Sequence, residues 1–272
     1  MTAPVRTTDG IFTWAWKDGF LIAQTILPVP LHEYRRLKSA LTVLQNRNPK
    51  PAGMAGGQVV ATLHGTGILE IREPDQPYPW FSPVWDAPDE STMKWSGLVM
   101  ALWEIQQTAV CIANGQDAWS KVHRPCVHGG IDFRSLGCDG TVRGHCLEYI
   151  AASVRDVRSE CGVLIGDPRF EAPELFAGEY PTEASDVFAA AAVFCARNRL
   201  GTLDSLPTGA ATGAHLLPKH RVGGADERYS KRERSWLLSL LDDDPQARLW
   251  AAASLTGVQP IVVGNGSGQG NG

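Results

Sequence analysis

The chain has 272 residues, a length that fits one two-lobed domain or two small domains. It carries 25 basic and 29 acidic residues, so its formal net charge is −4 and it presents no overall positive field to nucleic acid. The apolar run that ends at Ala196 is too short to cross a bilayer core of about 30 Å. We therefore expect a folded protein whose partners include neither nucleic acid nor a membrane.

Cysteine usage and the N-terminal residues indicate the compartment. Six cysteines at irregular spacing do not resemble the dense disulfide framework of a small secreted domain. The first ten residues carry one arginine and are not followed by the apolar segment of a signal peptide. These features predict a cytoplasmic protein with reduced thiols.

The first third of the chain reads mainly as β-structure. Aromatic and branched residues of the range 11–27 flank the turn signal Lys17-Asp18-Gly19, which predicts a hairpin whose second strand is Phe20–Leu27. A second hairpin is predicted from Val59–Leu63 and Ile68–Ile71, with glycines at the turn between them. Between the two hairpins, apolar residues three or four apart predict a helix: Tyr34, Leu37, Leu41 and Leu44.

Helical patterns dominate the remainder. Glu183–Arg197 is alanine-rich and apolar nearly all round, which predicts a buried helix, and leucines at helical spacing predict another over Glu233–Leu241. The tail Gly264–Gly272 holds only Gly, Ser, Asn and Gln, and we expect it to be disordered. An apolar stripe, with Ser91 or Ser96 as its N-cap, predicts one further long helix: Leu98, Leu102, Ile105, Ala109 and Ile112.

Several segments of the second half resemble protein kinases. The stretch Gly166-Asp167-Pro168-Arg169-Phe170-Glu171-Ala172-Pro173-Glu174 resembles the end of the kinase activation segment, and Ala184-Ser185-Asp186-Val187-Phe188 follows at the family's spacing. Leu240–Arg248 resembles a segment near the end of the same fold. Val127–Asp132 resembles the catalytic loop, and Asp139–Val142 resembles the turn before the metal-binding motif.

The resemblance covers about Ala15 to Leu255 and implies an α+β, bilobal protein-kinase-like fold. Residues 1–92 would form a reduced, β-rich N-lobe with one helix and no glycine-rich loop. Residues 93–258 would form a larger helical C-lobe, and 259–272 the disordered tail.

The resemblance also assigns positions to the kinase chemistry, and the residues there are unsuited to it. Gln24 stands in place of the phosphate-binding lysine, and Glu33, at the very start of the following helix, is the only acid offered as its partner. In the catalytic loop the base, the lysine and the metal-binding asparagine correspond to Gly130, Asp132 and Ser135. The metal-binding aspartate corresponds to Cys146, although a two-residue shift would place Glu148 there.

By contrast, residues with structural roles in the family are kept. These are His128 under the catalytic loop, Ala172, Pro173, Glu174 in a buried ion pair with Arg248, and Asp186, which accepts hydrogen bonds from backbone amides. A scaffold kept without its chemistry predicts a pseudokinase that binds another protein. We expect no cofactor, no metal and no binding of ATP.

A transferase, a zinc site and a cysteine nucleophile are alternatives to this interpretation, and the tryptophans bear on the contact between the two expected lobes. A divergent phosphotransferase or nucleotidyl transferase would use ATP and one metal ion on Glu148 with Asp132 or Asp139. Cysteines and histidines at short spacing would suit zinc, or a Cys146 nucleophile, although no paired-cysteine motif frames them: Cys111, His123, Cys126, His128, Cys138, His145 and Cys146. Tryptophans gather where two lobes would meet and predict a packed hinge or a filled nucleotide cleft: Trp80, Trp85, Trp95 and Trp103.

Charged residues beside the activation-segment motif suggest a further, phosphate-related role. Asp167 stands where active kinases carry a threonine and would mimic its phosphorylated form, or it is simply a solvated surface acid. Arg155, Arg158 and Arg169 would hold a phosphate or an acidic segment of a partner.

Overall fold

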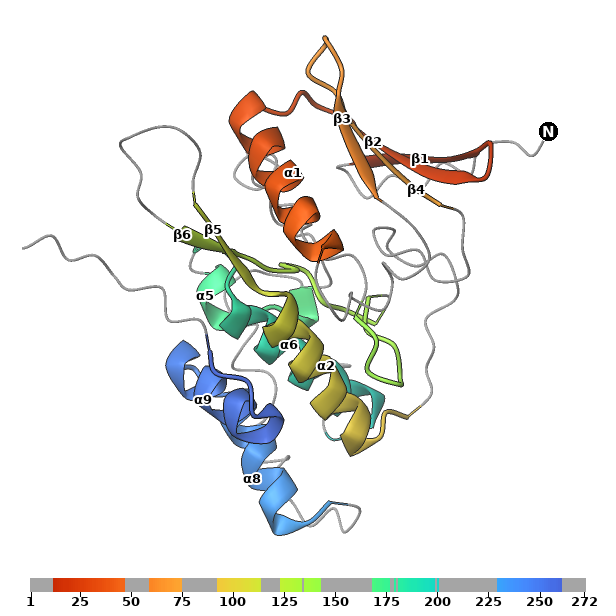
Figure 1. Cartoon of the computed structure of the whole chain (residues 1–272). Helices are drawn as coiled ribbons and strands as arrows, with labels where there is room; N and C mark the ends of the chain where they lie inside the picture. The colour runs from red at the N-terminus through yellow and green to blue at the C-terminus, as the bar shows by residue number, and fades with distance from the viewer. Residues whose placement is uncertain are drawn as a thin grey trace, which may run out of the picture.

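A computed structural model describes residues 12–46, 59–74, 92–113, 123–133, 135–142, 168–176, 179, 181–198, 200 and 229–260. The described residues form a mixed α+β structure with a four-stranded antiparallel sheet, a two-stranded hairpin and several helices (Figure 1). Of the tail expected to be disordered, residues 261–272 lie outside them. None of the described helices combines the length and the apolar character needed to span a membrane.

The four-stranded sheet confirms both predicted hairpins. Its strands are ordered β1-β2-β4-β3, with bounds β1 Phe12–Lys17, β2 Phe20–Thr25, β3 Val60–Leu63 and β4 Leu69–Pro74. Asp18 and Gly19 join the first pair with φ of 52° and 76°, the left-handed backbone that a two-residue turn needs to match the strand twist.

The two faces of the sheet differ in burial. Along β2, Leu21, Ala23 and Thr25 are buried on one face. On the other face Phe20 and Gln24 are exposed, and Ile22 between them is buried. The same alternation runs along β4, where Leu69 and other residues of the first face are buried and their neighbours are half-buried. The sheet therefore has one packed face and one face that is largely open to solvent.

Helix α1, Leu31–Gln45, follows β2 as predicted and lies beside β3 (Figure 1). Its side chains bond to the backbone at this edge of the sheet. The Tyr34 hydroxyl donates to the carbonyl of Ala61 at 3.3 Å, and the Gln45 amide donates to the carbonyl of Val59 at 2.5 Å. These bonds satisfy the carbonyl of Ala61 in β3 and that of Val59 directly before it, and they cover part of an edge that would otherwise be free to pair.

Helix α6, Glu183–Arg197, is the centre of the helical region and has the predicted bounds. Every one of its residues except Ala196 is buried. It packs against three other helices: α2 Trp95–Thr108, α8 Lys231–Leu240 and α9 Pro245–Thr256. Its alanines permit this close packing from several sides, because a methyl group leaves room for a neighbouring helix.

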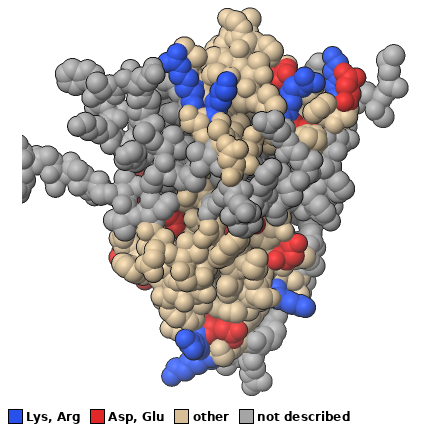
Figure 2. All heavy atoms as spheres, in the orientation of Figure 1, with Lys and Arg blue, Asp and Glu red and all other residues tan. Residues whose placement is uncertain are grey.

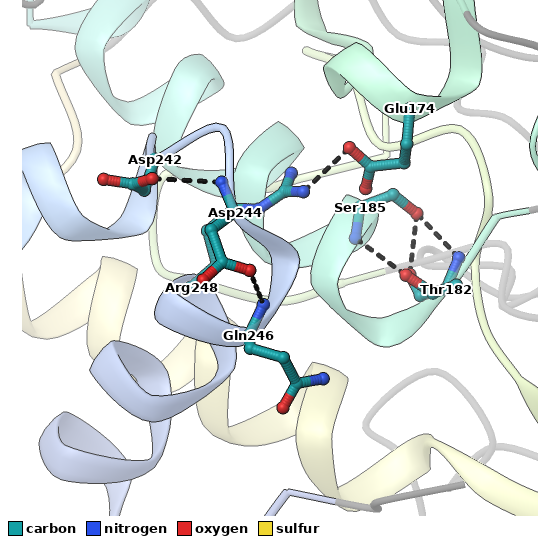
Figure 3. A network of polar contacts seen from close by, with 7 residues as sticks. All are labelled: Glu174, Thr182, Ser185, Asp242, Asp244, Gln246 and Arg248. Atoms are coloured by element: carbon teal, nitrogen blue, oxygen red, sulfur yellow. Dashed lines mark hydrogen bonds and ion pairs between the residues drawn. The ribbon is translucent and has the colours of Figure 1, made fainter. Parts of the chain in front are cut away.

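The start of α6 is fixed by a capping box. The side chain of Thr182 accepts from the Ser185 amide, and the Ser185 hydroxyl oxygen accepts from the Thr182 amide at 2.8 Å (Figure 3). Two amides that a helix start leaves unpaired are thereby satisfied. In α9 the Asp244 carboxylate accepts from the Gln246 amide at 2.9 Å, which has the same effect.

The structure corrects the long helix predicted after residue 91. Helix α2 begins at Trp95 behind Lys94, which makes no side-chain cap, and neither predicted serine caps it: Ser96 is already inside the helix and Ser91 lies outside the described residues. The helix ends at Thr108, because the chain then forms strand β5, Val110–Ala113, which pairs with β6, His123–Cys126. Ile112 therefore belongs to a hairpin that the helical spacing does not reveal.

Charged side chains are unevenly spread over the face in Figure 2. Lys and Arg of the described residues appear near the top, beside the sheet and α1, and again at the bottom. The described surface between these two zones is mainly uncharged. This face carries no continuous basic patch among the described residues, in keeping with the net charge of −4.

Candidate functional site

The residues that resemble a kinase catalytic loop form a compact, buried segment after β6. Asp132 and Ser135 close it into a turn: the Asp132 amide donates to the Ser135 hydroxyl oxygen at 2.8 Å, and the Ser135 amide donates to the Asp132 carboxylate at 3.1 Å. Both residues are about 95 % buried, with exposures of 4 % and 5 %. Their polar atoms are thus engaged in holding the backbone of the turn.

Asp186, near the start of α6, holds the first part of this segment. Its two carboxylate oxygens accept the amides of His128 at 2.7 Å and Gly129 at 2.9 Å. Burial raises the pKa of Asp186 to about 7, the two amide bonds oppose that rise, and the charge of Glu183 adds to it. The sequence predicts a structural role in accepting amides for this aspartate, and the structure supplies those amides from a segment 57 and 58 residues earlier in the chain.

Arg197, at the other end of α6, holds the later part of the same segment. Its guanidinium donates to the carbonyls of Phe133 at 3.2 Å and Leu136 at 2.7 Å. The same group lies 5.5 Å from the centre of the Phe133 ring, within range of a cation–π contact. One helix therefore fixes the segment with a carboxylate acceptor near one end and a guanidinium donor at the other.

His128 and Gly130 are the next residues of the segment that the sequence singles out. His128 is 1 % exposed, and its Nδ1 accepts the Gly130 amide at 3.1 Å. The imidazole is therefore packed within the segment and bonded to its backbone. At Gly130, which the resemblance assigns to the position of the catalytic base, the chain offers no side chain to accept a proton.

Glu174 and Arg248 form the ion pair that the sequence predicts. Arg248 Nη2 lies 2.7 Å from Glu174 Oε2, and the two side chains are 0 % and 8 % exposed respectively (Figure 3). The guanidinium also lies 5.4 Å from the centre of the Phe188 ring in α6. Glu174 lies in the first turn of helix α5, Pro173–Phe176, which begins directly after the buried Ala172. The pair thus joins α5 to α9 across the face of α6.

Gln24 lies away from the buried side of the sheet. Its side-chain amide donates to Glu70 of β4 at 2.8 Å on the exposed face. The same carboxylate is 3.4 Å from His64 and 3.9 Å from Arg72. Gln24 is therefore part of a surface network. Glu33, the acid expected as the partner at the lysine position, lies in α1, and its side chain is not among those that the structure describes.

Several predicted site residues fall outside the described residues, and the structure adds nothing about them: Trp80, Trp85, His145, Cys146, Glu148, Arg155, Arg158 and Asp167. Within the described part, no three His, Cys, Asp or Glu residues are grouped so as to hold a metal ion. Trp95 packs edge-on against Phe194 of α6, with ring centroids 5.8 Å apart, so this tryptophan belongs to the helical core. Arg169 lies over the Phe170 ring at 5.5 Å.

Arg197 and Glu104 are buried charged residues of this region to which the sequence motifs assign no role. Arg197 is the only arginine of an otherwise apolar helix end, and that isolation is a signal that it has a buried partner. Glu104 interrupts the apolar stripe of α2, and its carboxylate accepts the Val142 amide at 3.4 Å. A charged residue at a position predicted to be buried would have identified both.

Comparison of the sequence with protein-family models and with curated proteins found no match.

Proposed function

We propose that the chain is a degenerate protein-kinase-like protein with two lobes, which binds another protein and transfers no phosphate. The observation that carries the proposal is the attachment of the segment 127–142 to α6. Asp186 and Arg197 fix its backbone, while Gly130 stands at the position of the base. A buried loop held in place without its reactive side chain is unsuited to moving a proton, and its attachment would serve the fold.

The electrostatics of the described residues support the same proposal. Phosphoryl transfer depends on positioned positive charge and metal ions around the phosphates. Gln24 carries no charge and is bonded to Glu70, and the Asp132 carboxylate is bonded to the Ser135 amide within its own turn. Neither side chain is placed to neutralise a phosphate or hold a metal ion there.

A thermal-shift measurement with ATP tests the absence of phosphotransfer. We expect millimolar ATP with Mg²⁺ or Mn²⁺ to leave the melting temperature of the full chain unchanged. A ligand present at one hundred times its Kd would stabilise the protein by about 2.7 kcal/mol, a shift of several degrees. A clear shift, followed by label transfer from ATP to protein, would instead favour the phosphotransferase or nucleotidyl transferase alternative.

Recovery of a stoichiometric partner tests the binding role. Met100 on α2 and Trp250 on α9 are 53 % and 57 % exposed, the most exposed of the large apolar side chains described. We expect the tagged chain to recover one protein in equal amount, and one of the variants Met100→Glu and Trp250→Glu to lose it while the other retains it. Each variant then serves as the folding control of the other. A chain recovered alone from its native source would contradict the proposal.

A further inference from the structure

Three apolar side chains are exposed close together in the chain where β2 leads into α1. Ile26, Leu27 and Leu31 are 44 %, 47 % and 52 % exposed, whereas Val29 between them is buried. Single exposed apolar residues are common on folded proteins, but this short segment concentrates three of them. Figure 1 shows the segment at the upper end of α1, beside the turn between β3 and β4.

The turn between β3 and β4 holds this segment in a fixed position. The Val29 amide donates to the carbonyl of Gly67 at 2.8 Å, and a Cβ at Gly67 would lie 2.9 Å from the Cβ of Pro28. Pro28 and Pro30 fix their own φ angles, and the Pro30 carbonyl accepts the Tyr34 amide at 3.1 Å at the start of the helix. A partner that covers the apolar side chains therefore does not have to order the backbone beneath them, which lowers the free-energy cost of binding.

Two cations continue the exposed side of α1 beyond Leu31. Arg35 and Lys38 follow Leu31 at helical spacing, so the three side chains lie along one side of the helix, and all three are exposed. Lys38 lies 6.0 Å from the centre of the Tyr34 ring, and neither cation forms an ion pair with a described residue. Figure 2 shows Lys and Arg side chains at the upper left without an acidic side chain of the described residues next to them. This side of α1 is thus apolar where the helix begins and basic further on.

We propose that an acidic protein segment with apolar side chains binds here, on a surface that we call the α1 surface: Ile26, Leu27, Leu31, Arg35 and Lys38. The apolar side chains of the partner would cover the three apolar residues, and its carboxylates would face the two cations. The inference goes beyond the proposed function. The α1 surface lies at the opposite end of the molecule from α9, and it is available whether or not the chain transfers phosphate (Figure 1).

A protein segment fits these observations better than a lipid surface or a nucleic acid does. Lipid headgroups are recruited by clusters of about four to eight Lys and Arg residues, whereas the sequence of α1 holds only Arg35, Arg36 and Lys38. The net charge of −4 also opposes the approach of an extended polyanion. A short acidic segment needs only local complementarity, which two cations beside an apolar surface supply.

Selection from random peptides displayed on phage, with the full chain as bait, tests the chemistry of the partner. We expect the selected peptides to be enriched in both acidic and apolar residues. Their affinity should fall as the salt concentration rises, because ions screen the contacts with Arg35 and Lys38. Peptides without acidic enrichment, or a selection that yields no binding peptide, would overturn the proposal.

Charge reversal assigns the binding to the α1 surface. Arg35→Glu with Lys38→Glu should weaken binding of the selected peptides at least about tenfold, and Leu27→Asp should do so with both cations in place. The matched control is Lys231→Glu with Arg232→Glu, which reverses two exposed cations at the start of α8 and should change the affinity by less than about twofold. All substitutions are on the surface, and the melting temperature of each variant shows whether it is folded. Unchanged affinity in the folded α1 variants, or an equal loss in the control, contradicts the proposal.

Two further measurements test other occupants of the α1 surface. Binding to vesicles of phosphatidylserine and phosphatidylcholine that Arg35→Glu with Lys38→Glu abolishes would identify a lipid surface. Self-association in analytical ultracentrifugation that the same variant abolishes would identify a second copy of the chain. Either result overturns the proposal, and we expect neither. Trp250→Glu should keep its affinity for the selected peptides, which separates failure of this inference from failure of the proposed function.

Discussion

The helical region and the open face of the four-stranded sheet place their polar side chains in opposite environments. Around α6 they are buried and join distant segments, as Arg248 does with Glu174, 74 residues away. On the open face of the sheet the contacts among Gln24, Glu70 and His64 are reached by solvent. A polar contact in water is worth little, whereas a buried one is costly to break. The difference teaches that the helical region specifies the fold and that the open sheet face tolerates change.

The largest effect is expected from breaking the buried ion pair. Arg248→Ala leaves the Glu174 carboxylate without its cation and should cost about 3 to 5 kcal/mol, measured as the free energy of unfolding in urea. The exposed Arg232→Ala is the control and should change stability by less than about 0.5 kcal/mol. Arg234 is unsuitable as a control because it donates to the Tyr229 carbonyl.

A double variant sharpens this prediction. Replacing both partners, as Glu174→Leu with Arg248→Met, leaves no unpaired charge and should destabilise less than Arg248→Ala alone. Equal stability of Arg248→Ala and the wild type would mean that the pair does not hold α5 to α9.

The next largest effect is expected where a loop touches α2. Gly140 has a φ of 93°, and a Cβ there would lie 2.2 Å from the Gly97 carbonyl oxygen of α2. Gly140→Ala should therefore cost about 2 to 4 kcal/mol from the clash and the unfavourable backbone together. Gly257 has a φ of 76° with nothing near its Cβ position, so Gly257→Ala should cost only about 1 kcal/mol. Similar melting temperatures for the two variants would contradict this close approach.

Titration of Asp186 should make the free energy of unfolding depend on pH. Its pKa is about 7 in the folded chain and returns to near 3.8 on unfolding, so between these values the folded state binds more protons. Its contribution to stability is then fully present below about pH 4 and is lost as the pH rises to about 7, by roughly 1 kcal/mol per pH unit. Urea unfolding of the wild type and of Asp186→Asn over this range gives the free energy of unfolding of each. The wild-type value minus the variant value should fall as the pH rises and should be constant above about pH 7. A wild-type value that increases with pH relative to the variant value would contradict this prediction.

The smallest effect is expected on the open face of the sheet. Gln24→Lys introduces the lysine that the kinase resemblance assigns to this position, but the side chain there meets Glu70 on the exposed face. Its stability should stay within about 0.5 kcal/mol of the wild type, and ATP should still produce no thermal shift. If Gln24→Lys gained nucleotide binding, the open face of the sheet would not be the tolerant surface that its exposed polar contacts indicate.

The sequence by itself determined the elements whose signals are short-range. Asp18-Gly19 between alternating apolar residues specifies a hairpin, and the all-round apolar pattern of Glu183–Arg197 specifies a buried helix with those bounds. Motif likeness predicted one long-range contact, between Glu174 and Arg248. Such signals succeed because turn geometry and helical periodicity depend on residues that are neighbours in the chain.

Only the tertiary structure decided the remaining features. The helical spacing runs on to Ile112, yet α2 ends at Thr108 because Val110–Ala113 pairs with a strand that starts at His123. Arg197 gains its role from carbonyls more than sixty residues away. Gln24 points away from the packed side of the sheet because β2 pairs with β4 in a register that places it beside Glu70. In each case the deciding energy is a hydrogen bond or burial supplied by a distant segment, which no local pattern records.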